Sequence, residues 1–275
     1  MNKTKKIAGM LGIPYTVWAA VFIIVPLLMV FWYGLTDASG HFTLANVASI
    51  AEPAHSKALL MALILSLIAT GVCLLLAYPL SMFLVETQKT THSFLAMLLI
   101  VPMWMNFLLR TMAWQTLLEK NGVINGILSF LHLPELSIIN TPGAIILGMV
   151  YNFLPFMVLP IYHVLAKIDD SIINAAHDLG ADHFQTLTRI LLPLSIPGIV
   201  SGVTMVFVPA LTTFVISDIL GGGKIMLIGN AIDQSFTKGS NWNLGAGLSL
   251  VLMIFILASM AILNKYDKDG KGGTF

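Results

Sequence analysis

The sequence predicts an all-α polytopic membrane protein with six transmembrane helices. Apolar residues make up 57% of the 275-residue chain and charged residues only 10%, whereas soluble domains carry about 25% charged residues. Six apolar runs are each long enough to cross the roughly 30 Å of membrane hydrocarbon as a helix. They cover Leu11–Leu35, Ala58–Val85, Phe94–Leu118, Gly143–Leu165, Ile190–Ser217 and Leu244–Leu263.

The first apolar run is expected to be a retained membrane span. Lysines precede it, as in a secretory signal, but a signal has a shorter apolar region and a small-residue cleavage site. We therefore expect three regions along the chain. Residues 1–57 hold the N-terminal tail, the first helix and an external loop. Residues 58–264 hold five helices with a coupling loop at 169–190, and residues 265–275 form a second tail.

The distribution of basic residues predicts the orientation. An even number of spans places both termini on one side, and the side richer in Lys and Arg is the cytoplasmic one. The N-terminal side carries Lys3, Lys5, Lys6, Lys89, Lys167, Arg189, Lys265, Lys268 and Lys271. The other side carries Lys57, Lys120, Lys224 and Lys238. Both termini and the polar loop between the fourth and fifth spans are therefore expected in the cytoplasm of a bacterial inner membrane.

Two external segments have distinctive patterns. The stretch GVINGILSFLHL from Gly122 is too short to span and is either a helix lying at the outer surface or a plain loop. The stretch SDILGGGK ends in Lys224 followed by Ile225, where a phosphate-binding loop needs Ser or Thr. We therefore expect no ATP hydrolysis by this chain and no cofactor bound to it.

Other features exclude further classes of function. The net charge of +1 gives no reason to expect a nucleic acid partner. The single cysteine, Cys73, lies within an apolar run, so neither a disulfide framework nor a thiolate metal cluster is expected. No group of residues suggests a nucleophile with its acid and base, so an enzyme is the least favoured class.

Polar and aromatic residues on the spans are candidates for a substrate path. Arg110 is the clear charge within a predicted span, and Asp218 follows the fifth span, beside a helix end whose dipole is negative. Arg110 is expected either to reach the interface or pair with a neighbouring acid, or else to pair with Asp218 beside the path. The path candidates are Trp104, Asn106, Arg110, Tyr151, Asn152, Phe214 and Asp218, although helix packing or an interfacial belt explains any single one. Prolines are expected to break helices in these spans at Pro102, Pro155, Pro160, Pro197 and Pro209.

The polar stretch from Asn174 to Pro193 predicts a helix, a turn and a second helix. Ile172, Ala176 and Leu179 fall at helical spacing and form a short apolar face. Gly180 suits a left-handed helix end. The next residue but one, Asp182, and Gln185 have the spacing of a capping box that starts a second helix. A small apolar face held between two spans is typical of a docking element.

The same stretch resembles the cytoplasmic EAA loop of ABC importer permeases. That pattern reads Glu-Ala-Ala, three residues, Gly, nine residues, Ile, any residue, Leu, Pro. Its positions fall here on Ala175, Ala176, Gly180, Ile190, Leu192 and Pro193, with Asn174 in place of the usual Glu. The resemblance implies the MetI-like fold of type I importers. It also implies coupling to an ATPase subunit through Asn174, Ala175, Ala176, Leu179 and Gly180.

Further stretches resemble the PotB branch of spermidine/putrescine importer permeases. They are LLIVPMWMNFLLRTMAW from Leu98, YNFLPFMVLPIYHVLAKID from Tyr151, SDILGGGKIMLIGN from Ser217 and WNLGAGLSL from Trp242. The resemblance implies a polyamine substrate, a PotC-like second permease, a PotA-like ATPase dimer that binds ATP and Mg, and a PotD-like external binding protein. The alternatives are an ABC importer of another small solute, such as an anion or a sugar, and an ATP-independent channel or facilitator.

Overall fold

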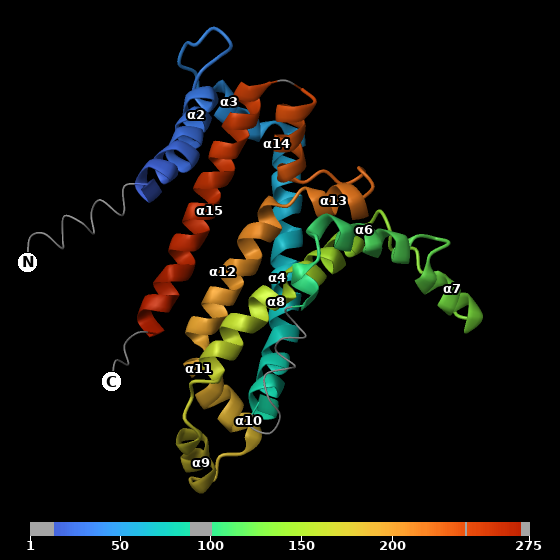
Figure 1. Ribbon diagram of the computed structural model, residues 1–275, viewed down its shortest axis with the longest axis vertical. Helices are drawn as coiled ribbons and strands as arrows, with labels where there is room; N and C mark the ends of the chain where they lie inside the picture. Colours follow the sequence, from blue (N-terminus) through green and yellow to red (C-terminus); the bar gives the residue numbers. More distant parts are fainter. Residues whose placement is uncertain (1–13, 89–100, 240, 271–275) are drawn as a thin grey trace, which may run out of the picture. The chain divides into compact units, whose positions relative to one another are not determined.

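The computed structural model describes residues 14–88, 101–239 and 241–270, and these residues form helices joined by turns (Figure 1). The long helices are α4 (Pro53–Gln88), α8 (Pro142–Leu165), α12 (Ile196–Thr212) and α15 (Trp242–Gly270). The shorter ones are α2 (Val25–Gly34), α3 (Ala45–Ala48), α6 (Phe107–Leu118), α7 (Val123–Phe130), α9 (Asp170–Asp178), α10 (His183–Thr186), α11 (Leu192–Leu194), α13 (Val215–Leu220) and α14 (Ile228–Thr237).

The chain divides into two compact units. One comprises the residues up to Ser56 together with Ala231–Phe255, and the other comprises Lys57–Asn230 with the residues from Ile256 onward. The expected regions 1–57, 58–264 and 265–275 remain a prediction.

Four of the six expected spans are single helices of sufficient length and apolar character. They are Pro14–Gly34, Pro53–Thr87, Pro142–Leu165 and Trp242–Leu263. The fifth expected span is not straight, because His183–Leu194 and Ile196–Thr212 meet at an angle of 66°. Pro193 and Pro197 lie on either side of this bend, and neither has a backbone N–H to donate to the preceding turn. The apolar run from Ile190 to Ser217 is therefore bent next to Pro197, one of the positions at which a proline is expected to break a helix.

The third expected span is described only in its second half. Residues 94–100 of this span lie outside the described residues, as do residues 11–13 of the first. A 3₁₀ turn covers Val101–Trp104, and α6 begins only after Asn106, whose side chain caps it by accepting from Leu108 N and Leu109 N. Twelve residues of α6 reach only about 18 Å at 1.5 Å per residue, which is less than a bilayer core. The count of six spans for the whole chain therefore stays a prediction.

Most of the prolines do not interrupt their helices, contrary to expectation. Pro155 and Pro160 lie inside α8, which runs unbroken from Pro142 to Leu165, and Pro209 lies inside α12. A proline within a membrane helix is tolerated where neighbouring helices and local adjustment satisfy the freed backbone carbonyl. Only Pro102, in the 3₁₀ turn, and Pro197, in the first turn of α12, lie at a break.

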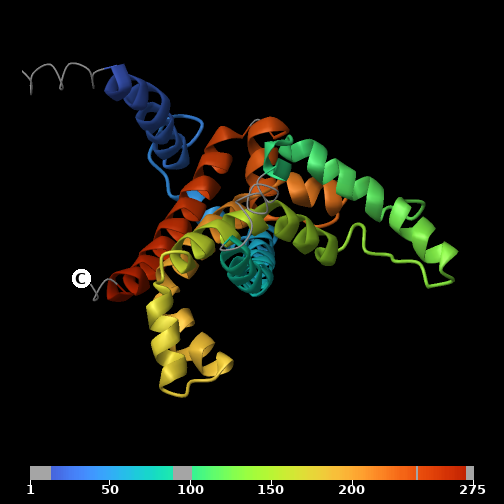
Figure 2. The same cartoon turned by 60° about the horizontal axis from the view of Figure 1, so that its bottom comes forward.

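Within the larger unit, α8 and α12 pack along each other (Figures 1 and 2). Gly198 and Gly202 give α12 the small-xxx-small spacing that lets membrane helices approach closely. A Cβ added at Gly198 would lie 2.9 Å from Pro160 O, and one at Gly202 would lie 2.7 Å from Met157 S. The glycines therefore set the distance between these two helices.

The smaller unit is held together by two asparagine side chains at the end of α2. Asn46 donates to Thr36 O (2.8 Å) and Asn243 donates to the same oxygen (2.6 Å) and to Tyr33 O (3.1 Å). Gly34 lies against the backbone of Ala246, where an added Cβ would be 3.1 Å from its carbonyl carbon. These contacts satisfy carbonyls that the end of α2 leaves free.

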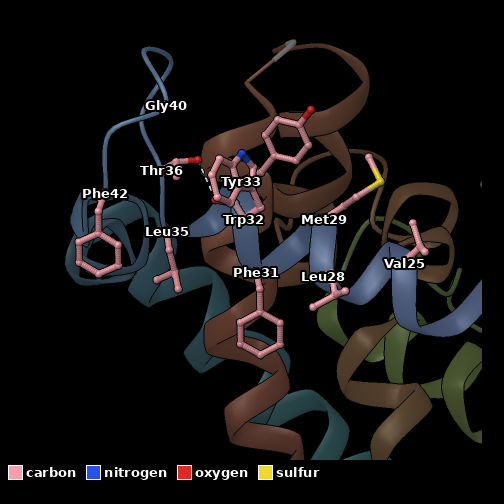
Figure 3. A pocket seen from close by; sticks show the side chains of 10 residues that line it. All are labelled: Val25, Leu28, Met29, Phe31, Trp32, Tyr33, Leu35, Thr36, Gly40 and Phe42. Carbon is pink, nitrogen blue, oxygen red and sulfur yellow. Dashed lines mark hydrogen bonds between the residues drawn. The ribbon is translucent and has the colours of Figure 1, made fainter. Parts of the chain in front are cut away.

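An open apolar groove runs along α2 and the loop that follows it (Figure 3). Its lining residues are Val25, Leu28, Met29, Phe31, Trp32, Tyr33, Leu35, Thr36, Gly40 and Phe42. The hydroxyl group of Thr36 donates to Trp32 O at 2.7 Å and is thus satisfied within the chain. The groove is therefore suited to apolar surroundings such as those of a membrane.

Candidate functional site

The polar stretch folds into a helical hairpin, as the sequence predicts. We use the name helical hairpin for Asp169–Thr186, which contains α9 and α10 and projects from one end of α8 in both views (Figures 1 and 2). Asp169 caps α9 by accepting from Ser171 N at 2.8 Å, and this hydrogen bond holds the pKa of the Asp169 carboxyl below its ordinary value. The carboxylate cap is therefore fully present at neutral pH and is lost only as the pH falls through the lowered pKa.

The turn of the helical hairpin depends on Gly180. The N–H of Gly180 donates to His177 O (2.9 Å) and that of Ala181 donates to Ala176 O (3.0 Å), which is the pattern of a Schellman motif. This motif needs a left-handed residue, and Gly180 has φ +84°. The predicted glycine-terminated helix end is confirmed.

The second helix of the hairpin starts at a capping box, also as predicted. Asp182 accepts from Gln185 N, and the Gln185 side chain accepts from Asp182 N at 3.2 Å. Across the turn, the His177 and His183 rings pack edge to face with centroids 5.5 Å apart. The two helix ends that meet at the turn are therefore satisfied within the hairpin itself.

The residues expected to contact an ATPase differ in how exposed they are. Leu179 is 89% exposed, and Asn174, Ala175 and Gly180 are also exposed. Ala176 is only 7% exposed, so its side chain leaves little surface for a partner. Phe184, which sequence reasoning missed, is 72% exposed. The sequence could have indicated Phe184, since it is a large aromatic residue among polar neighbours.

The candidate path residues lie where three helices meet. α6 and α13 pack together, and both contact α8. Gly148 of α8 allows the approach of α13, because a Cβ there would meet Leu220 and would lie 3.0 Å from Ile216 Cγ2. The rings of Trp114 and Tyr151 meet at 5.3 Å between α6 and α8. These helices therefore converge, and their role as a path remains a prediction.

Two buried polar atoms at this meeting point have no hydrogen-bond partner among the described residues. Arg110 of α6 is 8% exposed and its Nε is unsatisfied, and Asn152 of α8 is 1% exposed with Oδ1 unsatisfied. The Asn152 amide nitrogen donates to Gly148 O at 2.9 Å. Unpaired buried polar atoms are costly and are exceptions in folded proteins, where most buried polar atoms have a partner. The remaining candidates Trp104, Asn106 and Phe214 are exposed.

The expected pair of Arg110 and Asp218 is not formed within the part of the chain that the structure describes. Asp218 instead accepts from Asn230 Nδ2 at 2.7 Å. The expected negative helix end is also wrong, because Asp218 lies in the first turn of α13, which starts after a break at Thr213 and Phe214. An acid in the first turn of a helix faces the positive end of its dipole.

Asn230 is the residue at this site that sequence reasoning missed. It lies in the stretch LIGN and is 2% exposed. The chain reaches it from Asp218 through a glycine turn in which Gly222 and Gly223 have φ +58° and +69°. A Cβ on Gly222 would collide with Asn140, so the turn needs glycine for space as well as for conformation.

The fold and the hairpin define a class: a membrane-embedded permease with a projecting helical hairpin. The chain belongs to the family of binding-protein-dependent transport system inner membrane components, whose model matches residues 7–268. Within that family it is similar to the spermidine/putrescine transport system permease protein PotB of Salmonella typhimurium, with 38% identity over 92% of this chain and 91% of the relative. The Escherichia coli PotB is 39% identical over 86% of this chain and 89% of its own length.

A solved structure supports the same fold. The chain matches a bacterial ABC transporter that imports the acidic polysaccharide alginate, with a TM-score of 0.77 over 97% of this chain and 96% of that chain. Sequence identity to it is 16%, so this likeness concerns the fold alone. The expected all-α permease fold is confirmed.

Proposed function

We propose that this chain is the transmembrane permease subunit of an ATP-driven importer of polyamines such as spermidine and putrescine. The observation that carries the substrate class is the 38% identity to a spermidine/putrescine permease over nine-tenths of both chains. The fold alone does not identify the substrate, since an ABC transporter for an acidic polysaccharide has the same fold. Polyamines are flexible cations, which carboxylates and aromatic faces attract.

The helical hairpin supplies the contact through which ATP drives transport. Leu179 and Phe184 present large apolar side chains to solvent, and burying each in a groove of an ATPase subunit contributes about 1.5–3 kcal/mol. The Schellman motif and the capping box fix the turn between the two helices, so a push on the exposed residues moves the hairpin as a body. ATP-driven closure of the ATPase dimer then reorients the attached spans and alternates access to the path.

The proposal assigns partners and orientation together. A PotC-like permease completes the path, a PotA-like ATPase dimer binds ATP and Mg, and a PotD-like binding protein delivers the substrate from outside. This chain needs no cofactor of its own, and catalysis belongs to the separate ATPase subunit. Both termini and the helical hairpin lie in the cytoplasm, which is the side richer in Lys and Arg.

Deleting the gene from its host and restoring it on a plasmid tests the substrate class. We expect deletion to abolish accumulation of labelled spermidine or putrescine from dilute medium, and the plasmid to restore it. Excess unlabelled polyamine should compete, whereas sugars and anions should not. Unchanged polyamine uptake in the deletion strain, with loss of uptake of another solute, would instead favour an importer of that solute.

A further inference from the structure

The amide of Asn230 joins three segments of the junction between α12 and α14. Its Nδ2 donates to Phe214 O (3.1 Å) and to Asp218 Oδ1 (2.7 Å). Its Oδ1 accepts from Leu227 N (3.0 Å) and from Ser217 Oγ (2.6 Å). The amide is thus fully used, with two donors and two acceptors engaged at a position that is 2% exposed.

The network fixes which end of the amide faces Asp218. A backbone N–H can only donate, so the oxygen of the Asn230 amide must face Leu227. A backbone carbonyl can only accept, so the nitrogen must face Phe214. The hydrogen bond to Asp218 is therefore a donation from a neutral amide to a carboxylate, and turning the amide over would break both backbone contacts.

This arrangement holds Asp218 without neutralising its charge. Asp218 is exposed, and among the described residues it forms no ion pair with a basic side chain. Asn230 engages only Oδ1 of this exposed side chain, which leaves the second carboxylate oxygen for another donor. An arginine or lysine in place of Asn230 would cancel the charge that attracts a cation and would leave Leu227 N without its acceptor.

We infer that Asp218 accepts an ammonium group of the transported substrate and that Asn230 is the residue that positions its carboxylate. The inference rests on the proposed function, since it requires a cationic substrate. A carboxylate anchored through one oxygen to a buried amide is preorganised, so less freedom is lost when the cation binds. Phe214 O, which also accepts from Asp218 N at 2.9 Å, links the Asn230 amide to the start of α13, the helix that carries Asp218.

The test measures polyamine transported per ATP hydrolysed by the complete importer in proteoliposomes, together with membrane abundance of this chain. Asp218→Asn keeps an acceptor for the Asn230 amide and removes only the charge. We expect normal abundance and a loss of about tenfold or more in polyamine moved per ATP. Asn230→Asp places a second carboxylate against Asp218, and we expect a similar loss. Thr212→Val is the matched control, because the Thr212 hydroxyl bonds only to carbonyls of its own helix.

The exchanged pair Asp218→Asn with Asn230→Asp separates positioning from a structural role. The amide introduced at position 218 can donate to the carboxylate introduced at position 230, so the hydrogen bond returns with its direction reversed. The charge, however, then lies at a buried position. We expect abundance above that of Asn230→Asp alone, because the hydrogen bond to position 218 returns, but below the wild type, because a carboxylate at position 230 cannot donate to Phe214 O. Transport per ATP should stay low.

Restored transport in the exchanged pair, or wild-type transport in Asp218→Asn, would overturn the inference and leave the polyamine importer intact. Absence of polyamine transport by the wild-type complex would overturn the proposed function and the inference with it. An equal loss in Thr212→Val would also overturn the inference, because the effect would then not be specific to the carboxylate.

Discussion

Substituting Gly180 tests how strongly coupling depends on the left-handed turn of the helical hairpin. Gly180 has φ +84°, and no heavy atom lies within 4 Å of a Cβ built on it. The cost of a side chain is therefore conformational and owes nothing to a clash with neighbours. An L-residue in this region costs about 1–2 kcal/mol, and asparagine costs less because it adopts the left-handed conformation more readily.

The predicted order of activity is Gly, then Asn, then Ala, then Val at position 180. A penalty of about 1–2 kcal/mol lowers the ratio of correctly turned to misturned hairpin by about 5- to 30-fold. Valine adds the restriction of a β-branched side chain to that penalty. The assay is substrate-stimulated ATPase activity of the assembled importer, normalised to the amount of this chain in the membrane.

Gly126→Ala provides the matched control. Gly126 lies in α7, has open space around its Cβ position and has no positive φ, so alanine there should leave stimulated ATPase activity unchanged. Equal activity in Gly180→Val and Gly180→Asn would refute the reasoning, because their difference depends only on the backbone conformation.

Three other substitutions test the hairpin and the packing. Asn174→Glu introduces the usual family residue at an exposed position. We expect uptake to change by less than about twofold, since exposed charges contribute little. A complete loss of assembly, measured by co-purification, would contradict this expectation. Gly202→Leu forces a side chain into Met157 and should lower the stability of the fold by about 1–3 kcal/mol or more, seen as low membrane abundance on immunoblots. Gly71→Leu has open space around its Cβ position and should leave the abundance unchanged. Asp182→Ala removes the capping box at about 1 kcal/mol and should speed amide hydrogen exchange in α10; unchanged exchange would count against the cap.

Local features of the chain were predictable because their causes are local. The helix end at Gly180 and the capping box at Asp182 each depend on residues only a few positions apart, and both are observed. Long apolar runs likewise predicted the helices that are present as single spans. A break at Pro197 was predicted, but the 66° angle of the bend was not, because hydropathy and proline positions report the length of an apolar run and the place of a break and say nothing about direction.

The side-chain partners at the path candidates were not predictable in the same way. The sequence left Asp218 as one of two alternatives for Arg110, by charge alone. In the structure Asp218 is bonded to Asn230, and Arg110 Nε has no partner among the described residues. The partner of an acidic side chain depends on how its helix is rotated. Here it also depends on the glycine turn that returns the chain to Asp218, so that Asn230, 12 residues later, bonds to it. The burial of Ala176 depends likewise on how α9 packs. The spacing of apolar residues along the sequence does not report this packing.

The central claim is that this chain forms part of an ATP-driven polyamine importer. Its most direct test is labelled spermidine accumulation in proteoliposomes that contain this chain with its second permease and ATPase, supplied with the binding protein on the external side. We expect accumulation against a gradient with ATP on the ATPase side, and none with a non-hydrolysable analogue. Equal spermidine entry in both conditions, stopping at equal concentrations, would identify a facilitator and contradict the account.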